Sequence, residues 1–117
     1  MKVIIAGSRN LNSLYPYSFV ESVVEQSEFQ ITEVVSGGCR GADAFGEIWA
    51  RANNLPTKIF SAEWKKYGKA AGPIRNEEMA KYADALIAIR VNHSKGTSNM
   101  IKLAKKYNLK TYIVELP

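Results

Sequence analysis

Three glycines, Gly37, Gly38 and Gly41, lie between a short apolar run and a stretch with helical periodicity. Glycine lets backbone amides approach a ligand closely and adopt positive φ. The helix that follows presents free N–H groups and the positive end of its dipole, a setting in which phosphate binds well. The spacing differs from the dinucleotide fingerprint and from the P-loop. It therefore predicts either a phosphate-binding turn or a tight strand-to-helix turn.

A second glycine-bearing helix start is expected at Gly96. Thr97 or Ser98 would cap that helix by accepting a hydrogen bond from a backbone N–H two or three residues later. The same hydroxyl groups and amides could hold a phosphate. Two such helix starts at one edge of a sheet predict an anion site more strongly than either alone.

Three arginines, Arg9, Arg40 and Arg75, lie in or beside the same loops. A guanidinium group suits bidentate recognition of phosphate, so three of them near one crevice favour an anionic ligand. The alternative is a surface position or a structural ion pair, for example with Asp43. In the ligand-binding interpretation, Asp43 or Asn76 would hold a ribose hydroxyl or orient an arginine.

A long connection runs from Trp64 to Asn76 and contains two large aromatic residues, Trp64 and Tyr67. Connections of this length are often functional lids, and an aromatic ring can stack on a base. The alternative, which we favour for Trp64, is that the rings cover the core. Residues 95–110 carry five lysines and no acid. Such a surface suits nucleic acid or, more commonly, is a solvated helix face.

Two further residue pairs give weaker signals. Cys39 and His93 fall in loops of the same expected edge, so a thiolate–imidazolium pair could form. A buried cysteine and an exposed histidine are the far more common arrangement. Glu77 and Glu78 follow Arg75 at an expected helix start. Acidic side chains stabilise the helix dipole there, so these two residues do not by themselves indicate acid–base chemistry.

The elements that position these residues are predicted from five short apolar runs, which alternate with stretches of helical periodicity. The runs are nearly continuous, which is typical of strands buried on both faces of a sheet. Strands that alternate with helices predict a parallel sheet with right-handed crossovers. The expected strands are residues 3–6, 33–36, 58–60, 85–89 and 112–114, and the expected helices are residues 16–29, 41–53, 73–83 and 97–107.

The fold class predicted from this pattern is α/β. It is a Rossmann-like three-layer α/β/α arrangement around a five-stranded, mostly parallel sheet. Ligands of such sheets bind at the carboxyl ends of the strands, where the strand order reverses. The glycine- and arginine-bearing loops follow the expected strands, so we expect them to converge at one edge.

The composition limits the classes of protein to which the chain can belong. Hydrophobic residues make up 46% and charged residues 23%, as in an ordinary soluble protein, and 117 residues suit one domain, residues 1–117. One cysteine and one histidine exclude an internal disulfide and a zinc site built from such ligands. No apolar run is long enough for a membrane span or a secretory signal. We expect a cytoplasmic protein without a membrane partner or metal site, whose net charge of +5 suits an anionic ligand.

The chain carries, in this order, Gly7-Ser8-Arg9, the loop from Gly37 to Asp43, the segment from Ala62 to Asn76, Met79, Ala83-Asp84-Ala85, and Gly96-Thr97 followed by Met100. Together these motifs resemble the YspA-type, YpsA-related family of the SLOG superfamily. The resemblance extends over essentially the whole chain, and the motifs are specific in combination. It implies a Rossmann-like domain that binds a nucleotide or a nucleotide-derived ligand at the glycine-rich edge.

Two better-known groups of this superfamily imply different activities. LOG-type proteins are phosphoribohydrolases that cleave the base from a nucleoside 5′-monophosphate, and Arg75, with Met79 nearby, matches their arginine. Their glutamate has no counterpart in residues 94–100, although glycosidic cleavage requires a carboxylate. For an enzyme that cleaves an N-glycosidic or phosphoester bond, the catalytic candidates are Arg75 and Asp43.

DprA-type proteins, which bind single-stranded DNA, share a Ser-Gly-x-Ala-Arg-Gly-x-Asp loop. Residues 36–43 resemble that loop, with Cys39 in place of the alanine. We expect the chain to hold only the core domain of such proteins. LOG-like and DprA-like folds commonly pair. Apolar positions such as Tyr82 and Ile101 could therefore form a homodimer contact; the alternative is that they pack in the core of a single chain.

The residues thus lead to three ranked functions. The first is binding or sensing of a nucleotide or nucleotide-derived ligand whose phosphate lies at the glycine-rich loops. A LOG-like nucleotide-processing enzyme and a DprA-like single-stranded DNA-binding protein are the alternatives. No cofactor is identified, although Mg²⁺ could arrive with a nucleotide. The expected ligand-binding residues are Gly7, Ser8, Arg9, Ser36, Gly37, Gly38, Arg40, Gly41, Asp43, Arg75, Asn76, Gly96 and Thr97.

Overall fold

A five-stranded parallel sheet forms the centre of the computed structural model, which describes residues 1–117. The strands are β1 (Lys2–Gly7), β2 (Glu33–Ser36), β3 (Thr57–Ile59), β4 (Ala85–Val91) and β5 (Lys110–Leu116). They lie in the order β3-β2-β1-β4-β5, and every neighbouring pair is parallel. The predicted α/β class and Rossmann-like arrangement are confirmed. The strand order reverses between β1 and β4.

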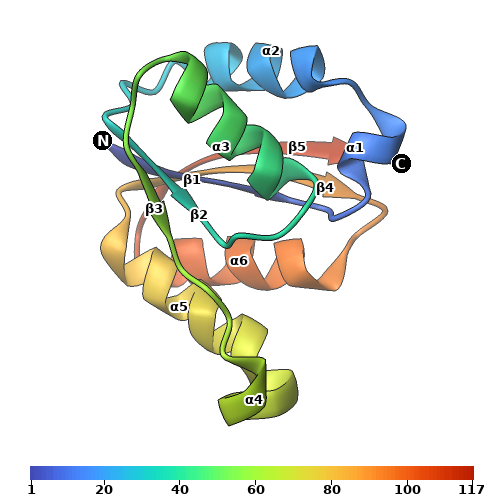
Figure 1. Ribbon diagram of the computed structural model, residues 1–117, viewed down its shortest axis with the longest axis vertical. Helices are drawn as coiled ribbons and strands as arrows, with labels where there is room; N and C mark the ends of the chain where they lie inside the picture. The colour runs from blue at the N-terminus through green and yellow to red at the C-terminus, as the bar shows by residue number, and fades with distance from the viewer.

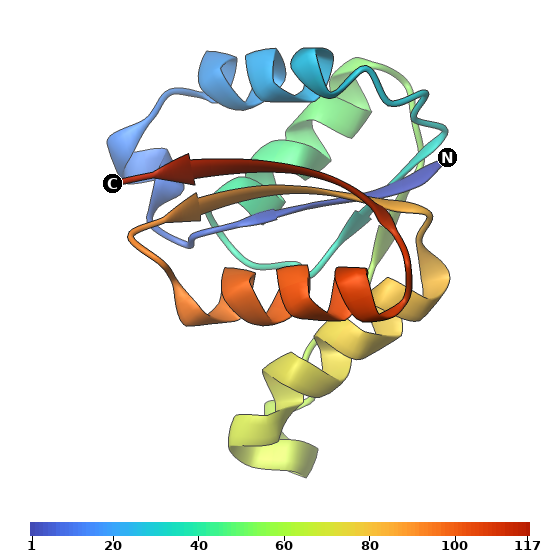
Figure 2. The ribbon, with the colours of Figure 1, turned by 180° about the vertical axis from the view of Figure 1, so that it is seen from behind.

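Helices cover both faces of the sheet, which gives the molecule three layers (Figures 1 and 2). Two helices, α2 and α3, lie over one face, and α5 and α6 lie over the other. The helices are α1 (Leu11–Leu14), α2 (Tyr17–Ser27), α3 (Ala42–Ala52), α4 (Trp64–Tyr67), a 3-10 turn (Gly68–Ala70), α5 (Ala71–Tyr82) and α6 (Lys95–Lys106). None of them combines the length and the apolar character that crossing a membrane requires.

The core consists of two apolar clusters, one on each face of the sheet. Successive residues of a strand point to opposite faces, so Ile5 and Ile87 belong to one cluster and Ile4 and Leu86 to the other. The central strands β1 and β4 are buried on both faces, as predicted. That prediction is wrong for the two edge strands. All three residues of β3 are exposed, and β5 is at most half-buried, because an edge strand has a sheet neighbour on one side only.

The segment from Trp64 to Asn76 is helical rather than a long loop. It contains α4, the 3-10 turn and the start of α5. Pro73 fits in the first turn of α5, where its missing N–H removes no hydrogen bond. Together, α4 and the beginning of α5 project beyond the body of the molecule (Figures 1 and 2). Trp64 and Tyr67 are therefore 51% and 39% exposed, so the expectation that Trp64 covers the core is wrong.

Two helix starts also differ from their predicted positions. Helix α6 begins at Lys95, directly after Ser94, so neither Thr97 nor Ser98 is the cap residue. Instead, the Ser94 hydroxyl donates a hydrogen bond of 2.9 Å to Thr97 Oγ1, and the Ser98 hydroxyl donates one of 2.7 Å to the Ser94 carbonyl. Helix α5 begins at Ala71, before the Gly-Pro pair. As a result, Glu77 and Glu78 lie in the middle of that helix.

The two apolar positions considered for a homodimer serve mainly intramolecular packing. Ile101 is 5% exposed and belongs to the core cluster under α6, so it is not accessible to a second copy. Tyr82 is half-buried, and its ring packs edge-to-face on Phe60 at a centroid distance of 5.4 Å. The large apolar side chains that are exposed are Leu14, Ile48, Ile59, Trp64 and Tyr67.

Candidate functional site

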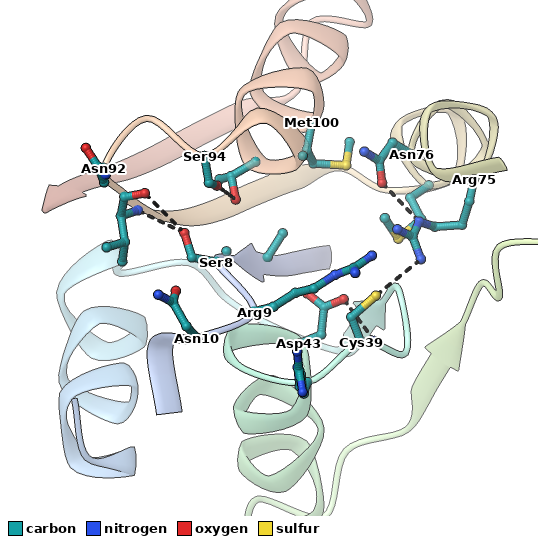
Figure 3. Close-up of a pocket in the computed structure, with 17 residues that line it drawn as sticks. Ser8, Arg9, Asn10, Cys39, Asp43, Arg75, Asn76, Asn92, Ser94 and Met100 are labelled. Carbon is teal, nitrogen blue, oxygen red and sulfur yellow. Dashed lines mark hydrogen bonds between the residues drawn. The ribbon is translucent and has the colours of Figure 1, made fainter. Parts of the chain in front are cut away.

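A cavity of about 520 Å³ opens at the carboxyl ends of β1 and β4, at the reversal of strand order (Figure 3). Small-molecule sites typically measure about 300–1,000 Å³. The lining comes from the β1–α1 loop, the β2–α3 loop, helix α5, and the turn from β4 into α6. These are the segments in which the sequence places its glycines and arginines.

Nine of the thirteen predicted binding residues line this cavity: Gly7, Ser8, Arg9, Arg40, Asp43, Arg75, Asn76, Gly96 and Thr97. The other four, which are Ser36, Gly37, Gly38 and Gly41, do not line it. They shape the β2–α3 loop instead. The Ser36 hydroxyl accepts a 3.1 Å hydrogen bond from the Gly38 N–H and donates one of 2.7 Å to Glu47.

Gly41 brings the β2–α3 loop against the β1–α1 loop. Its φ is +80°, and a Cβ at this position would lie 2.3 Å from the Ser8 carbonyl oxygen and 2.7 Å from that of Arg9. No residue with a side chain fits there without displacing backbone. The two loops that carry Arg9 and Arg40 therefore depend on this glycine for their approach.

Arg75 is 8% exposed and links three elements. Its Nη1 donates a 2.6 Å hydrogen bond to the Gly37 carbonyl, and its Nε donates one of 3.0 Å to Asn76 Oδ1. The Asn76 side chain in turn donates a 2.9 Å hydrogen bond to Asn99 Oδ1 on α6. Nη1 also lies 3.9 Å from the sulfur of Cys39. This network orients the guanidinium group at the edge of the cavity (Figure 3).

Asp43 lies near Arg75, in the first turn of α3, and is 7% exposed. Burial raises the pKa of its carboxyl group to about 6, against the lowering effects of the Cys39 N–H and the Arg75 and Arg9 charges. The Cys39 N–H donates to Asp43 Oδ2 at 3.3 Å. The ion pair with Asp43, the alternative interpretation of the arginines, is absent: the two salt bridges of the chain are Arg90–Glu115 and Lys106–Glu77. The carboxylate and the arginines nonetheless share one cavity.

Ser8 joins the two central strands at the base of the cavity. Its hydroxyl accepts a 3.0 Å hydrogen bond from the Val91 N–H, and it is 5% exposed. The binding-residue prediction missed four polar neighbours in the lining, namely Asn10, Cys39, Asn92 and Ser94. Asn92 has a φ of +48° in the turn between β4 and α6. An asparagine directly after an apolar strand is the sequence signal that marks such a turn.

Of the pair Cys39 and His93, only the cysteine lies at the cavity. The structure therefore gives no support to a catalytic pair of these two residues. No three histidine, cysteine or acidic side chains cluster closely enough to bind a metal ion.

The remaining surface of the cavity is apolar. Ala6 and Val91 lie at the strand ends, and the buried thioethers of Met79 and Met100 come from α5 and α6. Cationic groups, a helix start and two thioethers in one lining would suit a ligand that combines an anionic group with a flat, less polar part.

Two known proteins are similar to this chain, one in sequence and one in fold. The Gene 61 protein of Mycobacterium phage D29 is 37% identical over 79 residues, which span 62% of this chain and 63% of that protein. The X-ray structure of DNA processing protein A (DprA) from Streptococcus pneumoniae matches with a TM-score of 0.58 at 17% identity, over 97% of this chain and 58% of that one. The DprA match shows a common fold. The chain thus spans less than two thirds of the length of either relative.

A family match gives the closer relationship. The YspA, cpYpsA-related SLOG family matches residues 1–67, which include β1, β2, β3 and both loops that carry Arg9 and Arg40. The match covers more than half of the 117 residues. The resemblance drawn from the motifs is confirmed, and the chain belongs to the YspA, cpYpsA-related SLOG family.

Proposed function

We propose that the chain binds a nucleotide or a nucleotide-derived phosphate ester in the cavity between β1 and β4. The observation that carries this proposal is the convergence of three arginines, each from a different segment, on one cavity. Arg9 comes from the β1–α1 loop, Arg40 from the β2–α3 loop and Arg75 from α5. Family and fold support a role connected with nucleotides or nucleic acids in general.

The three arginines are not equivalent. Arg9 and Arg40 are exposed, so their guanidinium groups are available to a phosphate. Arg75 already donates to Gly37 and Asn76, which makes it the more rigid group. The start of α6 adds backbone donors for an anion. The first hydrogen bond of this helix is donated by the Ser98 N–H to the Ser94 carbonyl, so the N–H groups before Ser98 in the helix have no partner within it.

A thermal-shift screen at fixed salt tests the proposal. The panel holds nucleoside mono-, di- and triphosphates, cyclic nucleotides, dinucleotides, NAD and ADP-ribose, each with and without Mg²⁺. A ligand at a hundred times its Kd stabilises the fold by about 2.7 kcal/mol, which is a shift of several degrees for a domain of this size.

The matched pair Arg40→Ala and Arg51→Ala assigns any hit to the cavity. Both arginines are exposed, and each change removes one positive charge, but Arg51 lies at the end of α3, outside the cavity lining. Arg40→Ala should weaken binding about tenfold or more, whereas Arg51→Ala should leave it unchanged. Equal affinities in the two variants would overturn the assignment.

Hydrolysis of the bound nucleotide would have to use Asp43. It is the only acidic side chain that lines the cavity, and the first turn of α6 has no acid. Release of free base or phosphate by the purified protein, lost in Asp43→Asn, would make the chain an enzyme. Binding without release would support a sensing role.

Binding of single-stranded nucleic acid is the second candidate function. It is favoured by the projecting helix α4, where the exposed rings of Trp64 and Tyr67 stand among three exposed lysines, Lys65, Lys66 and Lys69. Aromatic rings and lysines of this kind stack on bases and neutralise phosphates. Oligonucleotide affinity should then fall steeply with salt and should fall further in Trp64→Ala. Weak binding that is independent of salt would exclude this function.

A further inference from the structure

The Asp43 carboxyl group accepts few hydrogen bonds from the protein and turns its remaining acceptor capacity to the cavity. It is 7% exposed, and its one hydrogen bond within the protein is from the Cys39 N–H to Oδ2. A carboxylate can accept about four hydrogen bonds, and buried charged groups normally find several partners. The side chain lines the cavity and points into it between Arg9 and Cys39 (Figure 3). The carboxylate is therefore free to accept hydrogen bonds from a ligand that fills the cavity.

The neighbouring cations supply charge to this carboxylate but no hydrogen bond. Neither Arg9 nor Arg75 forms an ion pair with it, and Nε and Nη1 of Arg75 already donate to Asn76 and Gly37. A phosphate cannot take the position next to Oδ1, because it would bring a second anion with no proton to donate. The fitting group is a neutral donor, covalently attached close to an anion that the arginines can bind.

The vicinal hydroxyl groups of a ribose meet both requirements. They present two O–H donors to one carboxylate, and in a 5′-nucleotide they belong to the same sugar that carries the phosphate. A guanine edge also presents two donors, but it is at the far end of the nucleotide from the phosphate. The cavity offers the base a different surface, the thioethers of Met79 and Met100.

We propose that Asp43 makes the cavity selective for ribonucleotides by accepting hydrogen bonds from the 2′- and 3′-hydroxyl groups of the ribose. This inference rests on the proposed function and names the sugar that the site recognises. A 2′-deoxyribonucleotide would leave a buried carboxylate oxygen without its donor, which is the arrangement that gives strong discrimination in binding sites.

Matched pairs of nucleotides test the inference directly. The probes are AMP with dAMP, GMP with dGMP, and ADP with dADP, titrated calorimetrically into the full chain. Each deoxynucleotide should bind at least about tenfold more weakly than its ribonucleotide. In Asp43→Asn the ratio should fall to about twofold or less, because the neutral amide is a weaker acceptor. Glu25→Gln, an exposed carboxyl-to-amide change on α2, should keep the full ratio.

The possible outcomes separate this inference from the proposed function. Equal affinities within each pair would overturn the ribose assignment and leave nucleotide binding in place. A preference for GMP over AMP that is independent of the sugar, and is lost in Asp43→Asn, would place the carboxylate at the base edge and overturn the assignment as well. If no nucleotide binds to a folded sample, as judged by circular dichroism, the proposed function itself fails.

Discussion

The Arg75 guanidinium donates a 2.6 Å hydrogen bond to the carbonyl of Gly37, 38 residues earlier in the chain. This bond joins α5 to the loop between β2 and α3, two of the segments that line the cavity. A Cβ at position 37 would lie 2.8 Å from both Arg75 Nη1 and Asp43 Oδ2. A residue without a side chain is therefore needed for the arginine and the carboxylate to come this close.

Gly37→Ala should disrupt the site more than the fold. The new methyl group meets the ends of two side chains, which can move, and no backbone atom under 3.0 Å. The loss of one charged hydrogen bond should lower the free energy of unfolding by about 1–3 kcal/mol. Nucleotide affinity should fall at least about tenfold as the guanidinium group moves. Urea unfolding and calorimetry check the two effects, and unchanged affinity would show that the position of Arg75 does not matter.

Asn99 positions Arg75 from outside the cavity. Its Oδ1 accepts from Asn76, and Asn76 accepts from Arg75 Nε, whereas Asn99 itself does not line the cavity. Asn99→Leu should weaken nucleotide binding several-fold, because the amide of Asn76 loses the acceptor that orients it. Asn99→Asp retains an acceptor and should restore the affinity. Equal losses in both variants, measured by calorimetry, would point to packing instead.

Asp43 should make folding stability depend on pH in an unusual direction. Burial raises its pKa from 3.8 to about 6, so the folded chain binds this proton more tightly than the unfolded chain does. The contribution of this group to stability is therefore lost as the pH rises from about 4 to about 6, a loss of about 3 kcal/mol. In urea unfolding, Asp43→Asn should be more stable than the wild type at pH 7.5, and this difference should shrink towards pH 4. A difference that grows on acidification would contradict the assigned cause.

Gly41 and Gly96 should respond in opposite ways to alanine. At Gly41, with φ +80°, the new Cβ would meet the backbone carbonyls of Ser8 and Arg9, so the variant should lose several kcal/mol or fail to fold. At Gly96, in the first turn of α6, nothing lies within 4 Å, and alanine should add up to about 1 kcal/mol. Thermal unfolding of the pair measures this contrast. A stable Gly41→Ala would mean that the two loops are less closely packed.

Trp64→Ala should have little effect on stability. The side chain is 51% exposed on the projecting helix, and a Cβ at Gly72 would stand 3.6 Å from its ring. We expect a loss of about 1 kcal/mol or less in urea unfolding. A larger loss would show that the ring is buried in solution, for example against a second copy of the chain, which gel filtration of the same variant would detect.

The local sequence pattern was sufficient to predict the strands, the longer helices and the edge of the sheet at which the site lies. Apolar runs and helical periodicity depend on nearest neighbours along the chain, so all five strands and the four longer helices were found. Alternation of strands with helices then led to the parallel sheet and to the edge at which the site lies. The loops at residues 7–10 and 37–43 were singled out because each follows a predicted strand and combines glycine with arginine.

Only the tertiary structure decided what each residue does at that edge. The sequence determined that Arg75, Gly37 and Asn99 were present. Their joining into one network depends on contacts between segments far apart in the chain, which no local pattern encodes. The burial that raises the pKa of Asp43 has the same origin. The exposure of Trp64 and of β3 also depends on the tertiary structure, because an apolar residue is covered only where the sheet and its helices extend over it.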